Sequence, residues 1–174
     1  MSFVVSFVPG VTPGKWERIW AERMPHMPLE LRPALQAEAL AAVHDGTAQM
    51  AFLRDVAPDD SLHVIQLYRE EPVVLTAKDS VVAAFDSVTV ADLVDETMLD
   101  GWSSDTVELV AAGVGLAIMP QSVARTHSRR DVVARPIIDG ADSGIGLAWL
   151  AGSKDPRVET FMGIVRGRTA NSTR

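Results

Sequence analysis

Strand-like and helix-like patterns alternate through the first third of the chain, and this alternation constrains the fold more than any other feature. Apolar runs that indicate strands occupy residues 3–8 ("FVVSFV"), 29–32 ("LELR") and 48–53 ("AQMAFL"). Stretches with helical spacing of apolar residues lie between them, at 13–24 and 34–46. Three strands joined by two helices predict a βαβαβ lobe whose strands are parallel.

Helix boundaries in this lobe are marked by residues that favour helix ends. Pro13 suits a first helical turn, and Thr12 before it is expected to be the N-cap. Gly46 is expected to end the second helix, because glycine adopts the left-handed backbone conformation of a helix end. The apolar face of the first helix is predicted to contain Trp16, Ile19, Trp20 and Met24.

The pattern changes after residue 60, where two strand-like runs at 62–68 and 71–77 follow each other with no room for a helix. This change predicts passage into a second lobe. We therefore expect residues 1–60 and about 152–168 to form the first lobe. Residues 61–151 would form a reduced second lobe, and residues 169–174 a disordered tail.

The second half of the chain contains further predicted elements. A helix is expected at about 105–112, with Asp105 and Glu108 spaced as in a capping box. The other expected elements are a strand over "VGLAIM", a helix opened by Pro120, strands over "DVVARPII" and "GIGLAWLA" around a turn, and a last helix beginning at Asp155-Pro156.

Composition excludes several function classes. The net charge is −7, no cysteine is present, and no apolar run approaches the ~20 residues of a membrane-spanning helix. The best basic cluster, Arg125, Arg129 and Arg130, lacks interleaved aromatic residues and is interpreted as solvated charge. We expect a cytoplasmic protein that binds neither membrane nor nucleic acid directly, with no disulfide and no cysteine-ligated zinc.

The loop "VPGVTPG" follows the first strand but carries neither the dinucleotide fingerprint nor a phosphate loop, since Lys15 is followed by Trp16. The loop still precedes a helix amino terminus. The amides there and the nearby Thr12 hydroxyl could form a weak site for an anion or a polar ligand. Arg54 directly follows the third strand, so we expect it at the same edge of the sheet. It could bind a carboxylate through two hydrogen bonds, or be a surface arginine paired with Asp55 or Asp59.

The residues do not indicate catalysis. The four histidines show no HExxH spacing, no GxSxG motif occurs, and Ser122 falls inside a predicted helix. We therefore expect no enzymatic activity, no metal site and no cofactor.

Four segments together resemble the effector-binding (substrate-binding) domain of LysR-type transcriptional regulators. They are "FVPGVTPGKW", "LELRPALQAEALAAVHDGTAQMAFLR", "LYREEPVVLTAKD" and, most specifically, "ELVAAGVGLAIMPQSVAR". The resemblance extends from about Phe3 to Arg168. It implies an α/β, two-lobed fold like that of the type II periplasmic binding proteins, a small effector in the cleft between lobes, and a homodimer.

The resemblance also implies ligand contacts, which fall here on Gly10, Val11 and Thr12, on Pro33, on Arg54, and on Ser103 and Ser104. Pro33 departs from the family pattern, since many relatives have a hydroxyl there. The family's winged helix-turn-helix has no counterpart in these residues. A strand–helix–strand stretch of the second lobe is replaced by "VDETMLDGWSS", so that lobe is expected to be shortened. Trp102 either covers the surface that the missing segment would leave exposed, or it is an ordinary core or dimer-contact residue.

Three functional hypotheses follow. The first is a regulatory domain of a LysR-type transcriptional regulator that senses a small polar or carboxylate ligand. The second is a stand-alone dimerisation or partner-binding module without ligand or DNA binding of its own. The third is an enzyme or solute-binding protein on a similar fold, which lacks both a convergent catalytic site and an export signal.

Overall fold

The structure is a computed structural model that describes residues 1–167, so the tail predicted for residues 169–174 lies outside the described residues. The chain divides into two compact units, and each is described by itself. Unit 1 contains residues 1–68 and the chain from residue 144 onward, and unit 2 contains residues 69–143.

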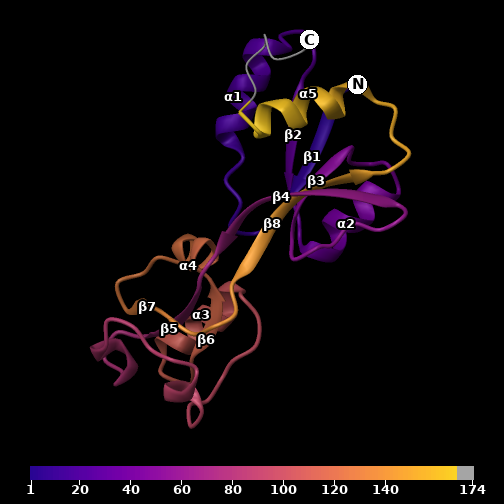
Figure 1. The fold of residues 1–174 in the computed structure, drawn as a ribbon. Helices are drawn as coiled ribbons and strands as arrows, with labels where there is room; N and C mark the ends of the chain where they lie inside the picture. The colour runs from indigo at the N-terminus through magenta and orange to yellow at the C-terminus, as the bar shows by residue number, and fades with distance from the viewer. Residues whose placement is uncertain (168–174) are drawn as a thin grey trace. The chain divides into compact units, whose positions relative to one another are not determined.

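A five-stranded sheet forms the centre of unit 1, in the order β2-β1-β3-β8-β4 (Figure 1). Its strands are β1 (Phe3–Phe7), β2 (Leu29–Pro33), β3 (Met50–Arg54), β4 (Leu62–Glu70) and β8 (Ser143–Leu150). β1 is parallel to both β2 and β3, as predicted, and β8 is antiparallel to β3. The connecting helices are α1 (Gly14–Arg23) and α2 (Gln36–His44), and α5 (Pro156–Val165) follows β8.

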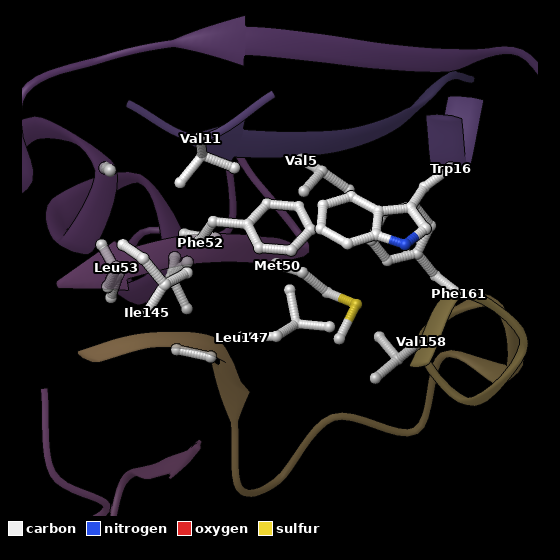
Figure 2. Packing of buried hydrophobic residues seen from close by; sticks show 14 of the residues in the cluster. Val5, Val11, Trp16, Met50, Phe52, Leu53, Ile145, Leu147, Val158 and Phe161 are labelled. Carbon is white, nitrogen blue, oxygen red and sulfur yellow. The ribbon is translucent and has the colours of Figure 1, made fainter. Parts of the chain in front are cut away.

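Aromatic side chains hold α1 and α5 against the sheet. The Phe52 ring stacks on Trp16 at 4.7 Å between ring centroids, and Phe3 stacks on Trp20 at 4.9 Å. Phe161 of α5 meets Trp20 edge-on at 5.8 Å. Figure 2 shows the Phe52 and Trp16 rings side by side above Met50 and Leu147. This core fixes the amino-terminal end of α1 over the sheet, which positions the loop that precedes it.

Unit 2 is built on a three-stranded antiparallel sheet in the order β6-β5-β7. The strands are β5 (Pro72–Ala77), β6 (Ala117–Pro120) and β7 (Val132–Pro136), and the helices are α3 (Ser104–Ala111) and α4 (Gln121–Thr126). Buried residues of α3 and α4 pack with one face of the sheet. Apolar residues near the short 3₁₀ turns η1 (Val82–Ala84) and η2 (Ala91–Leu93) form a second, smaller cluster with Val74.

The boundary between the units differs from the one expected at residues 60 and 152. The expectation placed β4 and β8 in the second lobe, whereas both strands belong to the sheet of unit 1. β7 and β8, which flank the turn "DGADSG", therefore do not pair with each other. β7 pairs with β5, and β8 pairs with β3.

Three helix starts test the predicted caps. Asp155 caps α5 as expected, since its side chain accepts a hydrogen bond from the Arg157 amide at 3.0 Å. The prediction for α1 was wrong: Pro13 occupies the N-cap, and among the described residues no side chain caps this helix. The capping box expected from Asp105 was also wrong, because α3 begins earlier and the Ser103 hydroxyl accepts from the Thr106 amide at 3.2 Å.

Candidate functional site

The carboxyl ends of β1, β2 and β3 lie at one edge of the unit 1 sheet, because these strands are parallel. Phe7 is in register with Pro33 on one side and with Phe52 on the other. The Ala34 amide donates to the Phe7 carbonyl at 3.0 Å, and the Val8 amide donates to the Phe52 carbonyl at 3.2 Å. Three of the predicted contact regions, namely the loop after β1, Pro33 and Arg54, are therefore brought to the same edge.

The loop from Pro9 to Pro13 has a defined conformation. Gly10 has a φ of 93°, a value that side chains rarely tolerate, so the turn requires glycine here. Val11 is buried in the unit 1 core, and its amide donates to the Val8 carbonyl at 3.3 Å. Thr12, which lies between Val11 and the start of α1, is exposed. The loop thus rests on an apolar residue and presents a hydroxyl to solvent.

The start of α1 adds polar groups beside this hydroxyl. The amides of Trp16 and Glu17 donate to the Pro13 carbonyl at 3.0 and 3.3 Å. The amides of Gly14 and Lys15 precede them, where a helix offers no carbonyl in its own preceding turn. Such amides can bind an oxygen of a polar ligand or an anion.

Arg54 is the cation of this edge, and its side chain is only 8% exposed. Its Nη2 donates to the Pro9 carbonyl at 3.3 Å, which ties the end of β3 to the loop after β1. The alternative of a surface arginine is therefore excluded for Arg54. Neighbouring Asp59, one of the two carboxylates considered as its partner, instead accepts hydrogen bonds from Ser61 and Leu62.

An apolar hollow of about 350 Å³ adjoins the same edge. Phe7, Pro9 and Pro33 line it, together with Leu35 and Glu38 at the start of α2. Glu38 is engaged, because its carboxylate accepts from the Leu35 amide at 3.0 Å. Pro33 thus supplies an apolar wall where a hydroxyl would offer a hydrogen bond. Thr12 and Arg54 do not line this hollow.

The remaining predicted residues, Ser103 and Ser104, lie in unit 2 at the start of α3, and both are exposed. The Ser103 hydroxyl is occupied by capping, since it accepts from the Thr106 amide and lies 3.2 Å from the Thr106 hydroxyl. Gly101, just before them, has a φ of 84°. Ser104 is the first residue of the helix, where its hydroxyl has no capping role.

Trp102 neighbours this helix start and is 38% exposed, so it is not a core residue. Its indole Nε1 donates to the Ile118 carbonyl of β6 at 3.0 Å. β6 is an edge strand in the three-stranded sheet, and an edge carbonyl needs a donor from outside the ladder. Trp102 therefore covers part of a strand edge of unit 2, next to the stretch that was expected to be shortened.

Comparison with known proteins decides the family. The model of the LysR substrate binding domain matches residues 14–105 and 103–170, which is most of the chain. The chain belongs to this family. The two matched segments overlap at residues 103–105, next to the stretch that is expected to be shortened. Among curated proteins, no match reaches significance.

Solved structures share the fold of this LysR substrate-binding domain at low sequence identity. The BenM effector-binding domain with its effector benzoate has a TM-score of 0.82 and 17% identity, over 95% of this chain and 90% of that chain. The OxyR regulatory domain C199D mutant from Pseudomonas aeruginosa has a TM-score of 0.77 and 18% identity, over 95% and 96%. A Corynebacterium glutamicum OxyR C206S mutant, H2O2-bound, has a TM-score of 0.78 and 20% identity, over 96% and 67%. The two-lobed, type II periplasmic-binding-protein-like fold is thereby confirmed.

The sequence did not predict two contacts at this sheet edge, one from Gln36 and one from Asp55, which was considered only as a partner of Arg54. The Gln36 side chain holds the Arg54 backbone at both polar groups, donating to its carbonyl at 2.7 Å and accepting from its amide at 3.0 Å. Asp55 adopts a φ of 51°, and its carboxylate accepts from the Gly144 amide at 2.7 Å. An aspartate directly after a strand is a weak signal for such a turn, whereas nothing local in the sequence indicates the Gln36 contact.

Within residues 1–167, no helix has the length and apolar character needed to cross a membrane. The same residues contain no group of three or more histidine, aspartate or glutamate side chains arranged to hold a metal ion.

Proposed function

We propose that this chain is a regulatory domain that binds a small polar or carboxylate effector and performs no chemistry on it. The gathering of Arg54, the Thr12 loop and the α1 start at one sheet edge carries the proposal. A guanidinium, backbone amides and a hydroxyl are the groups that bind a carboxylate. The effector-bound BenM domain of the same fold, whose effector is benzoate, supports this ligand class.

In this proposal Gly10, Val11, Thr12, Pro33 and Arg54 are the ligand contacts of unit 1. Ser103 and Ser104 at the start of α3 stay predicted contacts of unit 2, and they are described within that unit alone. The response to the effector is a change in the balance between conformations, which requires the ligand to bind one of them better. The proposed setting is a cytoplasmic homodimer that binds no DNA itself.

The first prediction is a ligand-dependent rise in melting temperature. The purified chain is screened against benzoate, other aromatic acids, aliphatic carboxylates and amino acids. A ligand that binds only the folded state adds about 2.7 kcal/mol at a hundredfold excess over its dissociation constant. We expect a hit that is weakened in Thr12→Ala and lost in Arg54→Lys, because lysine cannot reproduce the planar donor pair of arginine.

Arg32→Ala is the matched control, since Arg32 is an exposed arginine of β2 whose guanidinium pairs with Glu30 at 2.7 Å. It should leave the melting shift unchanged. Because Arg54 is buried, circular dichroism must first show that Arg54→Lys is folded. A hit that survives in both Thr12→Ala and Arg54→Lys would contradict the proposed site, and turnover of any ligand would contradict a purely regulatory role.

One observation favours a second candidate, the dimerisation or partner-binding module. Unit 2 exposes large apolar side chains around its 3₁₀ turns, namely Val81, Phe85, Val90, Val94 and Ile138. Large apolar side chains that are exposed to solvent can form an interaction surface when they lie together. A stable dimer by light scattering together with no ligand hit in the melting screen would favour this module over a sensor.

A further inference from the structure

Unit 2 contains a hollow of about 320 Å³ that lies outside every predicted contact region. Val73 and Leu75 of β5 and Ala134 and Pro136 of β7 line it, and cross-strand pairing places these four side chains on one face of the sheet. α3 and α4 pack on this face but leave part of β7 uncovered, because Ala134 is exposed. The floor of the hollow is therefore apolar and open to solvent.

Basic side chains line the rim of the hollow, although the whole chain is acidic. Arg125, His127 and Arg129 line it, and of the lining residues within the described chain none is acidic. Arg125 lies in the last turn of α4 and is exposed. Among residues 1–167, no carboxylate forms an ion pair with it. Arg125 is thus a charge available to a ligand.

Arg129 has a different part in the rim. Its Nε and Nη2 donate to the two carboxylate oxygens of Asp131 at 2.8 and 2.7 Å, and Nη1 donates to Glu108. These bonds to carboxylates raise the pKa of Arg129 above its ordinary value. They also fix the side chain as a wall of the hollow and neutralise its charge locally. The charge recognition of an anion therefore falls on Arg125.

His127 closes the rim on the side of Trp102. Its Nε2 lies 2.8 Å from the Trp102 carbonyl, and a carbonyl can only accept, so Nε2 carries the hydrogen. This bond fixes the orientation of the ring. Ser128 and Gln121 add a hydroxyl and an amide to the lining. Polar groups therefore stand around an apolar floor, as in sites for small organic molecules.

We propose that this hollow binds a small organic anion with an apolar body, of the class of single-ring aromatic carboxylates. The ring would lie on Leu75 and Ala134, and the carboxylate would accept hydrogen bonds from Arg125. The hollow's volume is at the lower end of the range for ligand pockets, which suits one ring. This second site shares no residue with the unit 1 edge, so it goes beyond the proposed function.

The test is an NMR titration of the ¹⁵N-labelled protein with benzoate, compared with benzyl alcohol as a neutral analogue. We expect saturable shifts at the amides of Leu75, Ala134 and Arg125, and much weaker binding of the alcohol. Arg125→Ala should weaken benzoate binding at this site about tenfold, the effect of losing one hydrogen bond to a charged group. Ala134→Glu should abolish it, because a carboxylate would then occupy the floor.

Arg130→Ala is the matched control, since it removes the same charge from an exposed arginine that does not line the hollow. An equal loss in Arg130→Ala and Arg125→Ala would overturn the proposal, because it would reduce the effect to general charge. Shifts confined to the loop after β1 and lost in Arg54→Lys would also overturn it while supporting the proposed function. The absence of saturable shifts at unit 2 amides would overturn it as well.

Discussion

For Arg54, the position in the sheet could be predicted from the sequence, but the burial of its side chain could not. Its place after β3 put it at the sheet edge, as expected from the sequence. Its burial follows from contacts that lie far away in the chain, to the Pro9 carbonyl and through its backbone to Gln36. A pattern read along the sequence finds the end of a strand but not the residues that fold back onto it. Position was therefore predictable for Arg54, and environment was not.

Ser6 offers a prediction at the same scale. It is fully buried in β1, and within the described chain its hydroxyl has no hydrogen-bond partner. A buried polar group without a partner costs about 1–3 kcal/mol. We expect Ser6→Ala to raise the free energy of unfolding by about 1 kcal/mol, the reverse of a usual core substitution, as measured by urea denaturation.

Gln49→Met is the contrasting variant in the same unit. The Gln49 side chain accepts from the Val4 amide at 2.8 Å, so its replacement leaves that amide without its acceptor. It should lower the free energy of unfolding by about 1 kcal/mol. If Ser6→Ala were as destabilising as Gln49→Met, the interpretation of Ser6 as an unpaired hydroxyl would be wrong.

At the scale of elements, strands and helices were predicted better than their ends. The strand–helix alternation of unit 1 is confirmed, and Gly46 ends α2 with a φ of 79° as expected. Caps depend on where the chain bends into the helix, which tertiary packing decides. Asp155 was predictable because the following Pro156 fixes that bend. The cap of α1 was not predictable in this way. Trp16 and Trp20 pack against the core, and the helix begins after Pro13 rather than after Thr12.

Asp155 supports a prediction about α5. Its carboxylate caps the helix and also accepts hydrogen bonds from the Arg157 guanidinium, the nearest at 2.6 Å. Asp155→Ala should lower the free energy of unfolding at pH 7 by about 1 kcal/mol, the usual cost of a lost cap. Asp155→Asn should cost less, because its amide oxygen can still accept from the Arg157 backbone.

The same residue predicts a dependence on pH. The hydrogen bonds from Arg157 hold the pKa of Asp155 below its ordinary value. Its contribution to stability is therefore fully present above about pH 4 and is lost as the pH falls through the lowered pKa. Denaturant unfolding at pH 7 and pH 2.5 gives the free energy of unfolding at each pH. The difference between the two values should be smaller for Asp155→Asn than for the parent chain. Equal differences would contradict this.

At the scale of the whole molecule, the sequence predicted two lobes but not which sheet each strand joins. β4 and β8 read as strands of the second lobe because they stand next to its other strands in the sequence. Their partners are chosen by long-range pairing, such as Leu53 of β3 with Gly146 of β8. A Cβ on Gly146 would come within 2.7 Å of Val64, so glycine permits a close approach there. The predicted contact residues of unit 1 lie at one edge of the sheet because parallel strands share that edge.

The Arg69–Asp142 ion pair lies where the chain enters and leaves unit 2. Arg69 Nε and Nη2 donate to the two Asp142 oxygens at 2.7 Å each, and these bonds hold the pKa of Asp142 below its ordinary value. Both side chains are about half exposed, so solvent screens the pair and it should contribute little to global stability. Asp142→Asn should instead speed amide hydrogen exchange at residues 69–72 and 142–144.

Glu30→Gln is the control, because it breaks a similarly exposed ion pair with Arg32 within β2. Hydrogen exchange followed by mass spectrometry should show no change at residues 69–72 and 142–144 in that variant. Faster exchange throughout the chain in Asp142→Asn would mean that the pair stabilises the whole fold, contrary to this prediction.

The adjacency of β8 and β4 in the unit 1 sheet has a consequence for how such a protein can evolve. Unit 2 is an insertion whose two ends leave from neighbouring strands, so the host sheet closes whatever length is inserted between them. Segments of the insert can then be lost or gained without disturbing the register of the host sheet. Selection can reshape the second unit in steps while the first remains a folded scaffold.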